Sequence, residues 1–123
     1  MLSPDEALRA TIAANLAGHE RSVERDMTLR HAAVAMTVVA DERGEACFII
    51  TRRVSSLRNH SGQWALPGGR IDEGEDPIGA ALRELDEEVA LRCDRENVLG
   101  LLDDYPTRSG FCITPVVVWA SAD

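Results

Sequence analysis

The apolar positions along the chain fall into two kinds of spacing, which predict different secondary structure. Near the N-terminus they recur every four residues, at Leu8, Ile12 and Leu16. This spacing predicts a helix over about residues 4–17, with Ser3 as its N-cap and Pro4 at its first position. Glu6 lies where it can complete a capping box, and Gly18 can end the helix.

Short runs rich in β-branched residues predict strands in the rest of the chain. These runs cover residues 31–40, 46–51, 98–102 and 112–120. The first two flank a turn sequence at 41–44 and therefore predict a hairpin. Residues 52–69 are rich in Arg, Ser and Gly, which predicts a loop with at most a short strand around 64–66. Ordered loops of this length are more often functional than not.

A second helix is predicted over about residues 77–90. Asp76 can cap it, and Pro77 suits its first position. The order of helix, strands, helix, strands predicts an α/β or α+β sandwich around a mixed sheet. At 123 residues, the chain has the size of a single domain, which we place over residues 1–123.

Composition and charge narrow the class of protein. Hydrophobic residues make up 45% and charged residues 28%, as in soluble globular proteins, and the apolar runs are too short to cross a bilayer. The first residues lack the features of a secretory signal, and three scattered cysteines fit reduced thiols, so we expect a cytoplasmic protein. The net charge of -8 argues against nucleic acid or an anionic membrane as partner.

Glutamates gather on one side of the second predicted helix. At about 100° per residue, Glu84, Glu87 and Glu88 fall within about 100° of arc. The apolar side is formed by Ile78, Leu82, Leu85 and Val89. Carboxylates that converge at about 4 Å repel each other by about 4 kcal/mol per pair at an effective dielectric of about 20. A hard cation such as Mg²⁺ or Mn²⁺ offsets this repulsion.

These glutamates alone favour a simpler interpretation, a solvated acidic helix face. Their surroundings favour a metal or phosphate site instead. Gly68 and Gly69 give a backbone that a metal or a phosphate can approach closely. Arg83 lies next to Glu84, and Glu75 lies upstream as its ion-pair partner. Such a pair can lock the loop onto the helix and orient Glu84.

The spacing of these residues matches a known pattern. Gly69, Glu75 and Arg83 lie at fixed intervals, and residues 83–91 read R-E-L-D-E-E-V-A-L. This closely resembles the Nudix box, G-x5-E-x7-R-E-U-x-E-E-x-G-U, in which U is aliphatic. Six fixed residues match, at a chance on the order of 10⁻⁷ per window. Ala90 replaces the glycine that closes the helix, so we expect an altered helix end with unchanged metal ligands.

The resemblance implies a Nudix-type α/β/α sandwich that hydrolyses nucleoside diphosphates linked to another moiety. It implies bound Mg²⁺ or Mn²⁺ with four ligands: Glu84, Glu87, Glu88 and the carbonyl oxygen of Gly68. The implied catalytic residues are Glu84, Arg83, Glu87 and Glu88. Glu84, helped by Arg83, would bind metal or act as the base, while Gly69 and Glu75 would support the site.

The loop before the box resembles the coenzyme A pyrophosphatase branch of the family, L-L-T-x-R-[SA]-x3-R-x3-G-x3-F-P-G-G. The matching residues keep every spacing: Thr51, Arg53, Arg58, Gly62, Pro67, Gly68 and Gly69. The departures are Ile49, Ile50, Val54 and Leu66. Residues 107–117 also look like that branch. The implied substrate is coenzyme A, cut to 4′-phosphopantetheine and adenosine 3′,5′-bisphosphate.

The forked guanidinium groups of Arg53, Arg58 and Arg70 suit the phosphates of coenzyme A, although a solvated loop arginine is an equal alternative for each. Trp64 is better interpreted as a core residue than as a base-stacking one, and His60 as a plain polar loop residue. Two rival functions stay open. One is a Nudix hydrolase for ADP-ribose, a dinucleotide or an oxidised nucleotide, and the other is a noncatalytic Nudix-fold binding module.

The C-terminus departs from the usual Nudix pattern. The chain stops at Asp123, directly after a predicted strand, whereas Nudix domains generally continue to another helix and often another catalytic carboxylate. We therefore expect that the C-terminal helix is absent. Asp103 and Asp104 are the nearby substitutes for a base. We expect a small-molecule substrate as partner, and a homodimer is the assembly to test.

Overall fold

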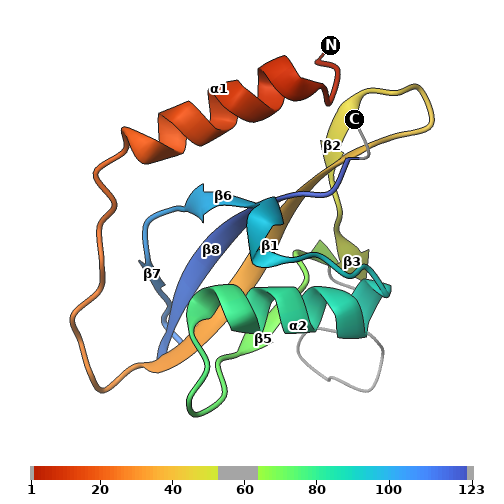
Figure 1. Ribbon diagram of the computed structural model, residues 1–123. Helices are drawn as coiled ribbons and strands as arrows, with labels where there is room; N and C mark the ends of the chain where they lie inside the picture. The colour runs from red at the N-terminus through yellow and green to blue at the C-terminus, as the bar shows by residue number, and fades with distance from the viewer. Residues whose placement is uncertain (1, 53–63, 122–123) are drawn as a thin grey trace.

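A long central strand, β1 (Arg30–Ala40), organises the fold in the computed structural model, which describes residues 2–52 and 64–121 (Figure 1). The helices are α1 (Glu6–Ala17), α2 (Pro77–Val89) and the short 3₁₀ helix η1 (Arg95–Asn97). The other strands are β2 (Ala46–Phe48), β3 (Thr51–Arg52), β4 (Trp64–Ala65), β5 (Gly68–Arg70), β6 (Val98–Leu101), β7 (Tyr105–Pro106) and β8 (Phe111–Trp119).

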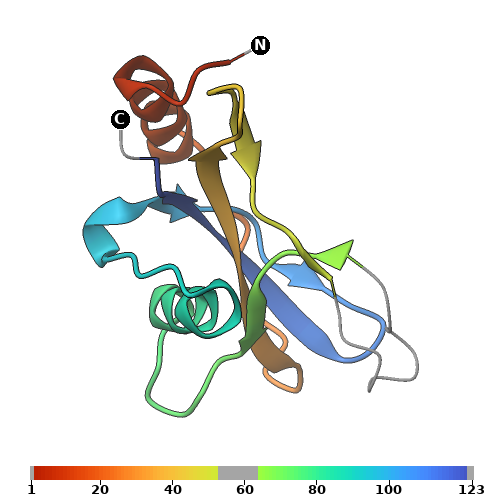
Figure 2. The same cartoon turned by 90° about the vertical axis from the view of Figure 1, so that its right-hand side faces the viewer.

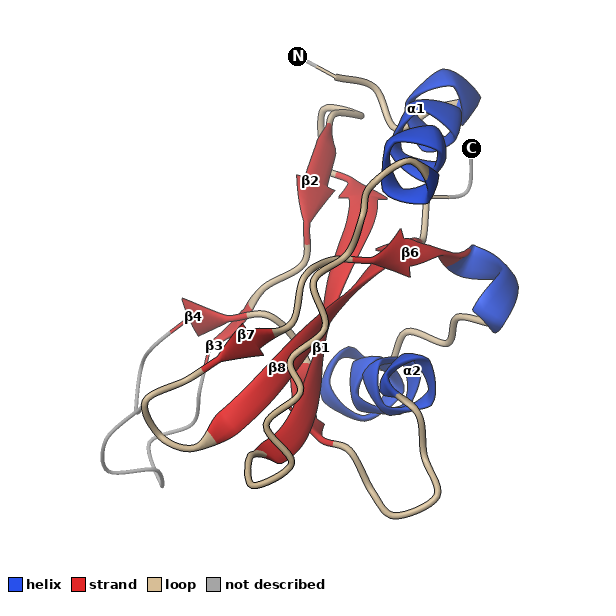
Figure 3. Ribbon diagram, turned by 90° about the vertical axis from the view of Figure 1, so that its left-hand side faces the viewer, coloured by secondary structure: helices blue, strands red, loops and turns tan. Residues whose placement is uncertain are grey.

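The central sheet is mixed because β1 has neighbours in both directions. It runs parallel to β8, with residues Arg30 to Val38 paired to Phe111 to Trp119. On its other edge it pairs antiparallel with β5 near its start and with β2 near its end. β6 and β7 both pair antiparallel with β8, and β3 with β4 forms a separate small sheet (Figure 3).

The two faces of this sheet carry different helices. Side chains alternate between faces along a strand, and Ala33 and Ala35 of β1 belong to the core that α2 completes. Met36 and Val38 alternate with them and line a pocket together with Ile12 of α1. The structure is therefore an α/β/α sandwich, with α1 crossing the end of the sheet near β2 and β6 (Figures 1 and 2).

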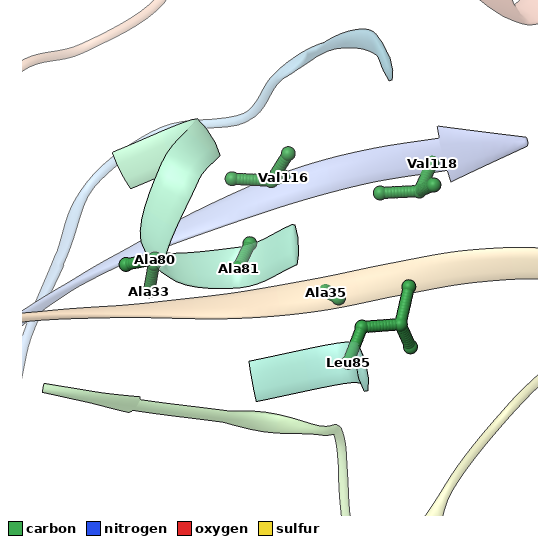
Figure 4. Packing of buried hydrophobic residues seen from close by; sticks show 7 residues of the cluster. All are labelled: Ala33, Ala35, Ala80, Ala81, Leu85, Val116 and Val118. Atoms are coloured by element: carbon green, nitrogen blue, oxygen red, sulfur yellow. The ribbon is translucent and has the colours of Figure 1, made fainter. Parts of the chain in front are cut away.

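Small residues let α2 lie close to the sheet. The fully buried cluster consists of Ala33, Ala35, Ala80, Ala81, Leu85, Val116 and Val118 (Figure 4). Alanines on both α2 and β1 leave little side chain between the helix and the strand, and Leu85 supplies the bulk. This packing fixes the position of α2, and therefore the position of the residues on its other sides, because close-packed interiors tolerate little displacement.

Most predicted elements are present, but their ends and the short strands differ. α1 begins at Glu6 and is capped by Asp5, whose side chain accepts from the backbone N–H of Leu8 at 3.0 Å. The predictions of Ser3 as N-cap, of Pro4 as the first helical residue and of Glu6 in a capping box are therefore wrong. The second predicted strand, 46–51, is interrupted between β2 and β3. β5 begins in the segment predicted as a loop, and β7 lies between two predicted strands where none was expected. Within the described ranges 2–52 and 64–121, no helix is long and apolar enough to cross a membrane.

Candidate active site

The glycine pair in β5 lets the chain pass closely between β1 and α2. A Cβ atom on Gly68 would lie 2.4 Å from the carbonyl oxygen of Ala33, and one on Gly69 would lie 2.5 Å from Oε2 of Glu84. Both distances are below any normal contact. Only glycine therefore allows β5 to pair with β1 while the Glu84 carboxylate rests against its backbone.

Local signals fix where α2 begins and ends. Asp76 accepts from the backbone N–H of Gly79 at 2.7 Å and from the guanidinium of Arg95 at 2.6 Å, and Pro77 is the first helical residue. At the other end, Ala90 adopts a left-handed conformation with φ 56° and ψ 34°. The substitution for the usual glycine thus leaves the helix end in place but puts a Cβ-bearing residue in a strained conformation.

Arg83 on α2 joins the helix to the loop before it and to β5. Its Nε and Nη2 donate to the two carboxylate oxygens of Glu75 at 2.9 and 3.0 Å. Nη1 donates to Oε2 of Glu84 at 2.8 Å and reaches Oε2 of Glu87 at 3.5 Å. Nη2 also donates to the carbonyl oxygen of Arg70 at 3.0 Å. The predicted ion pair between Glu75 and Arg83 is present, and Arg83 holds one oxygen of Glu84.

Glu75 and Arg83 each stabilise the charged form of the other. The Arg83 guanidinium lowers the pKa of the Glu75 carboxyl, and the backbone N–H of Asp72 lowers it further. In return, the Glu75 carboxylate raises the pKa of Arg83, with Glu84 adding to the effect. Two-pronged contacts between a guanidinium and a carboxylate are among the stronger hydrogen bonds in proteins. The pair is therefore a charged brace at neutral pH.

The glutamates of α2 differ in exposure and partners. The Glu84 side chain is 16% exposed and the Glu87 side chain 60% exposed. Oε2 of Glu88 accepts from the backbone N–H of Gly68 at 3.2 Å. Glu84 and Glu88 are thus held at the glycine pair, while Glu87 extends toward solvent. In the described part of the chain, no group of three or more His, Cys, Asp or Glu side chains is arranged to hold a metal ion.

A pocket of about 390 Å³ lies beside β5 on the face of the sheet away from the α2 core. Its floor includes Ala32 and Val34, which alternate with the core alanines of β1. The β5 backbone and Leu66 form one wall, and the turn between β7 and β8, with Thr107 and Ser109, forms another. Gly69 touches both this pocket and Glu84. The pocket and the glutamates therefore meet at the glycine pair.

Comparison with known proteins identifies the family of this site. The sequence model of the NUDIX domain matches residues 29–120, which include β5, α2 and the pocket. The chain belongs to the NUDIX domain family.

Individual relatives agree with this assignment. The chain is 44% identical over 89 residues to a Cronobacter sakazakii protein named "Uncharacterized Nudix hydrolase NudL", covering 72% of the chain and 45% of the relative. It therefore spans about half the length of the curated relatives it matches. The solved structure of the Nudix hydrolase RenU from M. smegmatis is 25% identical with a TM-score of 0.55, covering 76% of this chain and 63% of that one.

A more distant structure supports the fold alone. The C. elegans Ap4A hydrolase binary complex has a TM-score of 0.57 at 21% identity, covering 75% of this chain and 67% of that one. The Nudix-type sandwich predicted from the sequence is thus confirmed both by the arrangement of helices and sheet and by these neighbours.

The predicted substrate residues have different outcomes in this Nudix domain. Arg70 lies on β5, is exposed and lines the pocket. Arg53, Arg58 and His60 lie outside the described residues. Trp64 is 63% exposed, so the prediction of a core position is wrong. It lies in the two-residue strand β4, which pairs with β3, and the guanidinium of Arg52 lies 5.9 Å from the centre of its ring.

Asp103 and Asp104 are engaged away from α2. Asp103 accepts from His19 at 2.8 Å and from the backbone N–H of Ser22 at 2.9 Å. Asp104 accepts from Arg21 at 3.0 Å and from the hydroxyl of Thr114 at 2.8 Å. These carboxylates anchor the segment between α1 and β1 to the edge of the sheet. Their contacts give no support to a role as substitute base.

Sequence reasoning missed the pocket floor and its second wall. In the sequence, Ala32 and Val34 are part of an apolar run. Which of its side chains line a pocket depends on the strands that pair with β1. The sequence did point to residues 107–117, because they resemble the coenzyme A pyrophosphatase branch of the family. Only the pairing of β1 with β8 brings that segment opposite the glycine pair.

Proposed function

We propose that this chain hydrolyses the diphosphate linkage of coenzyme A or its derivatives, giving 4′-phosphopantetheine and adenosine 3′,5′-bisphosphate. One observation carries the proposal. Glu84 and Glu88 of α2 rest on the glycine pair, at the edge of a pocket large enough for a small molecule. Membership of the NUDIX family supports a diphosphate substrate, and the coenzyme A pattern in the loop before β5 supports coenzyme A.

The chemistry of the donor set suits a divalent metal ion, although the described side chains do not converge into a metal-binding group. Glu84, Glu87 and Glu88 offer the hard oxygen ligands that Mg²⁺ and Mn²⁺ prefer, and we propose the Gly68 carbonyl as a further ligand. The absence of a side chain on Gly69 keeps the Glu84 carboxylate directly against the β5 backbone. When bound, Mg²⁺ or Mn²⁺ would supply charge neutralisation for the diphosphate and a more acidic water.

The chain's own residues hold and orient this site. Arg83 fixes one oxygen of Glu84 and leaves the other for a metal ion or for the proton of the attacking water. Glu75 keeps Arg83 in place through two hydrogen bonds. Arg70 lies at the pocket, where its guanidinium can bind a phosphate group. We propose the same role for Arg53 and Arg58.

The decisive experiment is hydrolysis of coenzyme A with Mg²⁺ or Mn²⁺ and with the products resolved. We expect Glu87→Gln to lower the rate on the order of 100-fold, because it removes a charged metal ligand that stabilises the transition state. Asp86→Asn is the matched control, since Asp86 lies on the same helix but binds Arg92 at 3.4 Å. It should keep the wild-type rate. A Glu84→Gln protein with the wild-type rate would contradict the assignment.

A substrate panel separates coenzyme A from other Nudix substrates. Coenzyme A should be cleaved fastest among coenzyme A, ADP-ribose, dinucleotides and oxidised nucleotides, and removing its 3′-phosphate should slow it. If another compound is cleaved fastest, the proposal of diphosphate hydrolysis stands and coenzyme A is rejected as the substrate. A calorimetric titration in which neither Mg²⁺ nor Mn²⁺ binds would instead favour a noncatalytic binding module.

A further inference from the structure

Hydrogen bonds within the turn between β7 and β8 set the position of the Phe111 backbone. The backbone N–H of Thr107 donates to the carbonyl oxygen of Phe111 at 2.8 Å, and the N–H of Phe111 donates back to the Thr107 hydroxyl at 3.1 Å. That hydroxyl is also 3.0 Å from the hydroxyl of Ser109. Gly110 has φ of 90°, which closes the turn. The backbone that carries the Phe111 ring is therefore preorganised by these hydrogen bonds.

Arg30, the first residue of β1, clamps this turn from one side. Its backbone N–H donates to the carbonyl oxygen of Gly110 at 2.9 Å, and its Nη2 donates to that of Ser109 at 3.3 Å. Its guanidinium lies 4.4 Å from the centre of the Phe111 ring, in a cation–π contact. One face of the ring is thus covered by Arg30.

The same ring lines the pocket beside β5. Thr107 and Ser109 lie in the same wall, and the glycine pair of β5 lies in the wall opposite. The pocket therefore has an aromatic ring and hydroxyl groups at one side and the backbone of the glycine pair at the other. A planar group with polar edges matches this side, because it can stack on the ring while the hydroxyls bind its edge.

We propose that Phe111 is a specificity-determining residue that stacks against the purine base of the substrate, and that Arg30 is its positioning residue. This rests on the proposed function only in taking the pocket as the substrate pocket. The pantetheine arm is the rival occupant. An aliphatic arm gains little from an aromatic face backed by a cation, whereas bases stack readily on such rings.

The test is calorimetric binding of AMP and of 4′-phosphopantetheine, each with Mg²⁺. Phe111→Leu should weaken AMP binding about tenfold and leave 4′-phosphopantetheine binding unchanged. Phe111→Tyr keeps the ring and should restore AMP binding. Phe48→Leu is the matched control, because Phe48 is an exposed phenylalanine on β2 that lines the groove beneath α1. It should leave both affinities unchanged.

Arg30 is tested through its dependence on the ring. Arg30→Leu keeps the backbone hydrogen bond to Gly110. It should weaken AMP binding by about threefold, which is less than the loss of about tenfold expected for Phe111→Leu. In the Phe111→Leu background it should have no further effect on AMP binding. An equal loss in both backgrounds would mean that Arg30 acts independently of the ring and would overturn its positioning role.

Other outcomes overturn the role of Phe111. These are wild-type AMP affinity in Phe111→Leu, a loss of 4′-phosphopantetheine binding in its place, or no AMP binding by the wild type. Thermal unfolding of each variant identifies one that fails to fold; if Phe111→Leu does so, Phe111→Met replaces it, because methionine also fills the apolar space without an aromatic ring. AMP has no diphosphate linkage, so its binding is independent of hydrolysis. A chain that binds AMP through Phe111 but leaves coenzyme A intact would refute the proposed function alone.

Discussion

The two helices lie on the sheet in very different ways. α2 buries Ala80, Ala81 and Leu85 completely, whereas α1 buries no residue. Between α1 and the sheet lie apolar pockets of about 250 and 280 Å³, both lined by Ile12. The fully buried residues of α2 line neither of these two pockets nor the pocket beside β5.

The difference matches what each helix carries. α2 bears the glutamates and Arg83, whose hydrogen bonds to β5 and the preceding loop depend on the position of the helix. α1 contributes apolar side chains and a long hydrogen bond of 3.3 Å from Arg9 to the carbonyl oxygen of Glu96. Tight packing is therefore concentrated where catalytic geometry would need it.

The largest expected effect on the free energy of unfolding comes from truncating a side chain in the α2 core. Leu85→Ala should lower the free energy of unfolding by about 3 kcal/mol, because Leu85 is fully buried and its loss leaves a cavity. Ile12→Ala, the matched change under α1, should cost about 1 kcal/mol because its surroundings are already loosely packed. Urea unfolding measures both. Equal losses would contradict the contrast between the helices.

The next effect tests the close approach of β5. Gly68→Ala should cost about 2 kcal/mol, since the new Cβ would meet the backbone of Ala33 at 2.4 Å and neither strand can move freely. Gly18→Ala, after α1, is the control. Its Cβ would be 3.5 Å from the nearest atom at φ of -86°, so stability should stay equal or rise by a few tenths of a kcal/mol. An unchanged free energy of unfolding in Gly68→Ala would show that β5 can shift to accommodate the added methyl group.

The helix ends give a smaller effect of opposite sign. Ala90→Gly should raise the free energy of unfolding by about 1 kcal/mol, because glycine adopts the left-handed conformation at φ 56° without strain. Ala17→Gly, at the right-handed end of α1, should instead lower it by about 0.5 kcal/mol. Thermal unfolding followed by circular dichroism measures both. A destabilised Ala90→Gly would mean that the Ala90 methyl group makes a contact worth more than the strain.

The smallest expected effect is the pH dependence of the Glu75 and Arg83 brace. Its contribution is fully present above the ordinary carboxyl pKa of 4.5 and is lost as the pH falls through the lowered pKa of Glu75. The gap in unfolding free energy between wild type and Arg83→Gln should therefore shrink as the pH falls below 4.5. Arg83→Lys should lie between them, because it keeps the charge but loses the fork. A constant gap would show that Arg83 acts through packing alone.

Local signals in the sequence were sufficient for several features. Asp76 and Pro77 fixed the start of α2, and the helical period placed Leu85 inward with the glutamates elsewhere. The fixed intervals from Gly69 to Glu75 and Arg83 identified the family and the ion pair. These features depend on residues close in sequence, so their spacing alone determines which side chains meet.

Other features depended on contacts between distant segments. Capping by Asp5 in place of Ser3, the exposure of Trp64 and the engagement of Asp104 with Arg21 had no decisive local signal. Strands β5 and β7 are too short to be recognised by pattern and exist because β1 and β8 offer them partners.

By itself, the sequence determined that this chain carries a Nudix helix with its glutamates, its arginine and its glycine pair. The tertiary structure decided that β1 lies parallel to β8, which places Phe111 and Thr107 across a pocket from Gly69. The physical reason is that a helix face is set by bonds within one segment. A pocket is set by the pairing of strands far apart in the chain, and many alternative pairings satisfy the same local pattern.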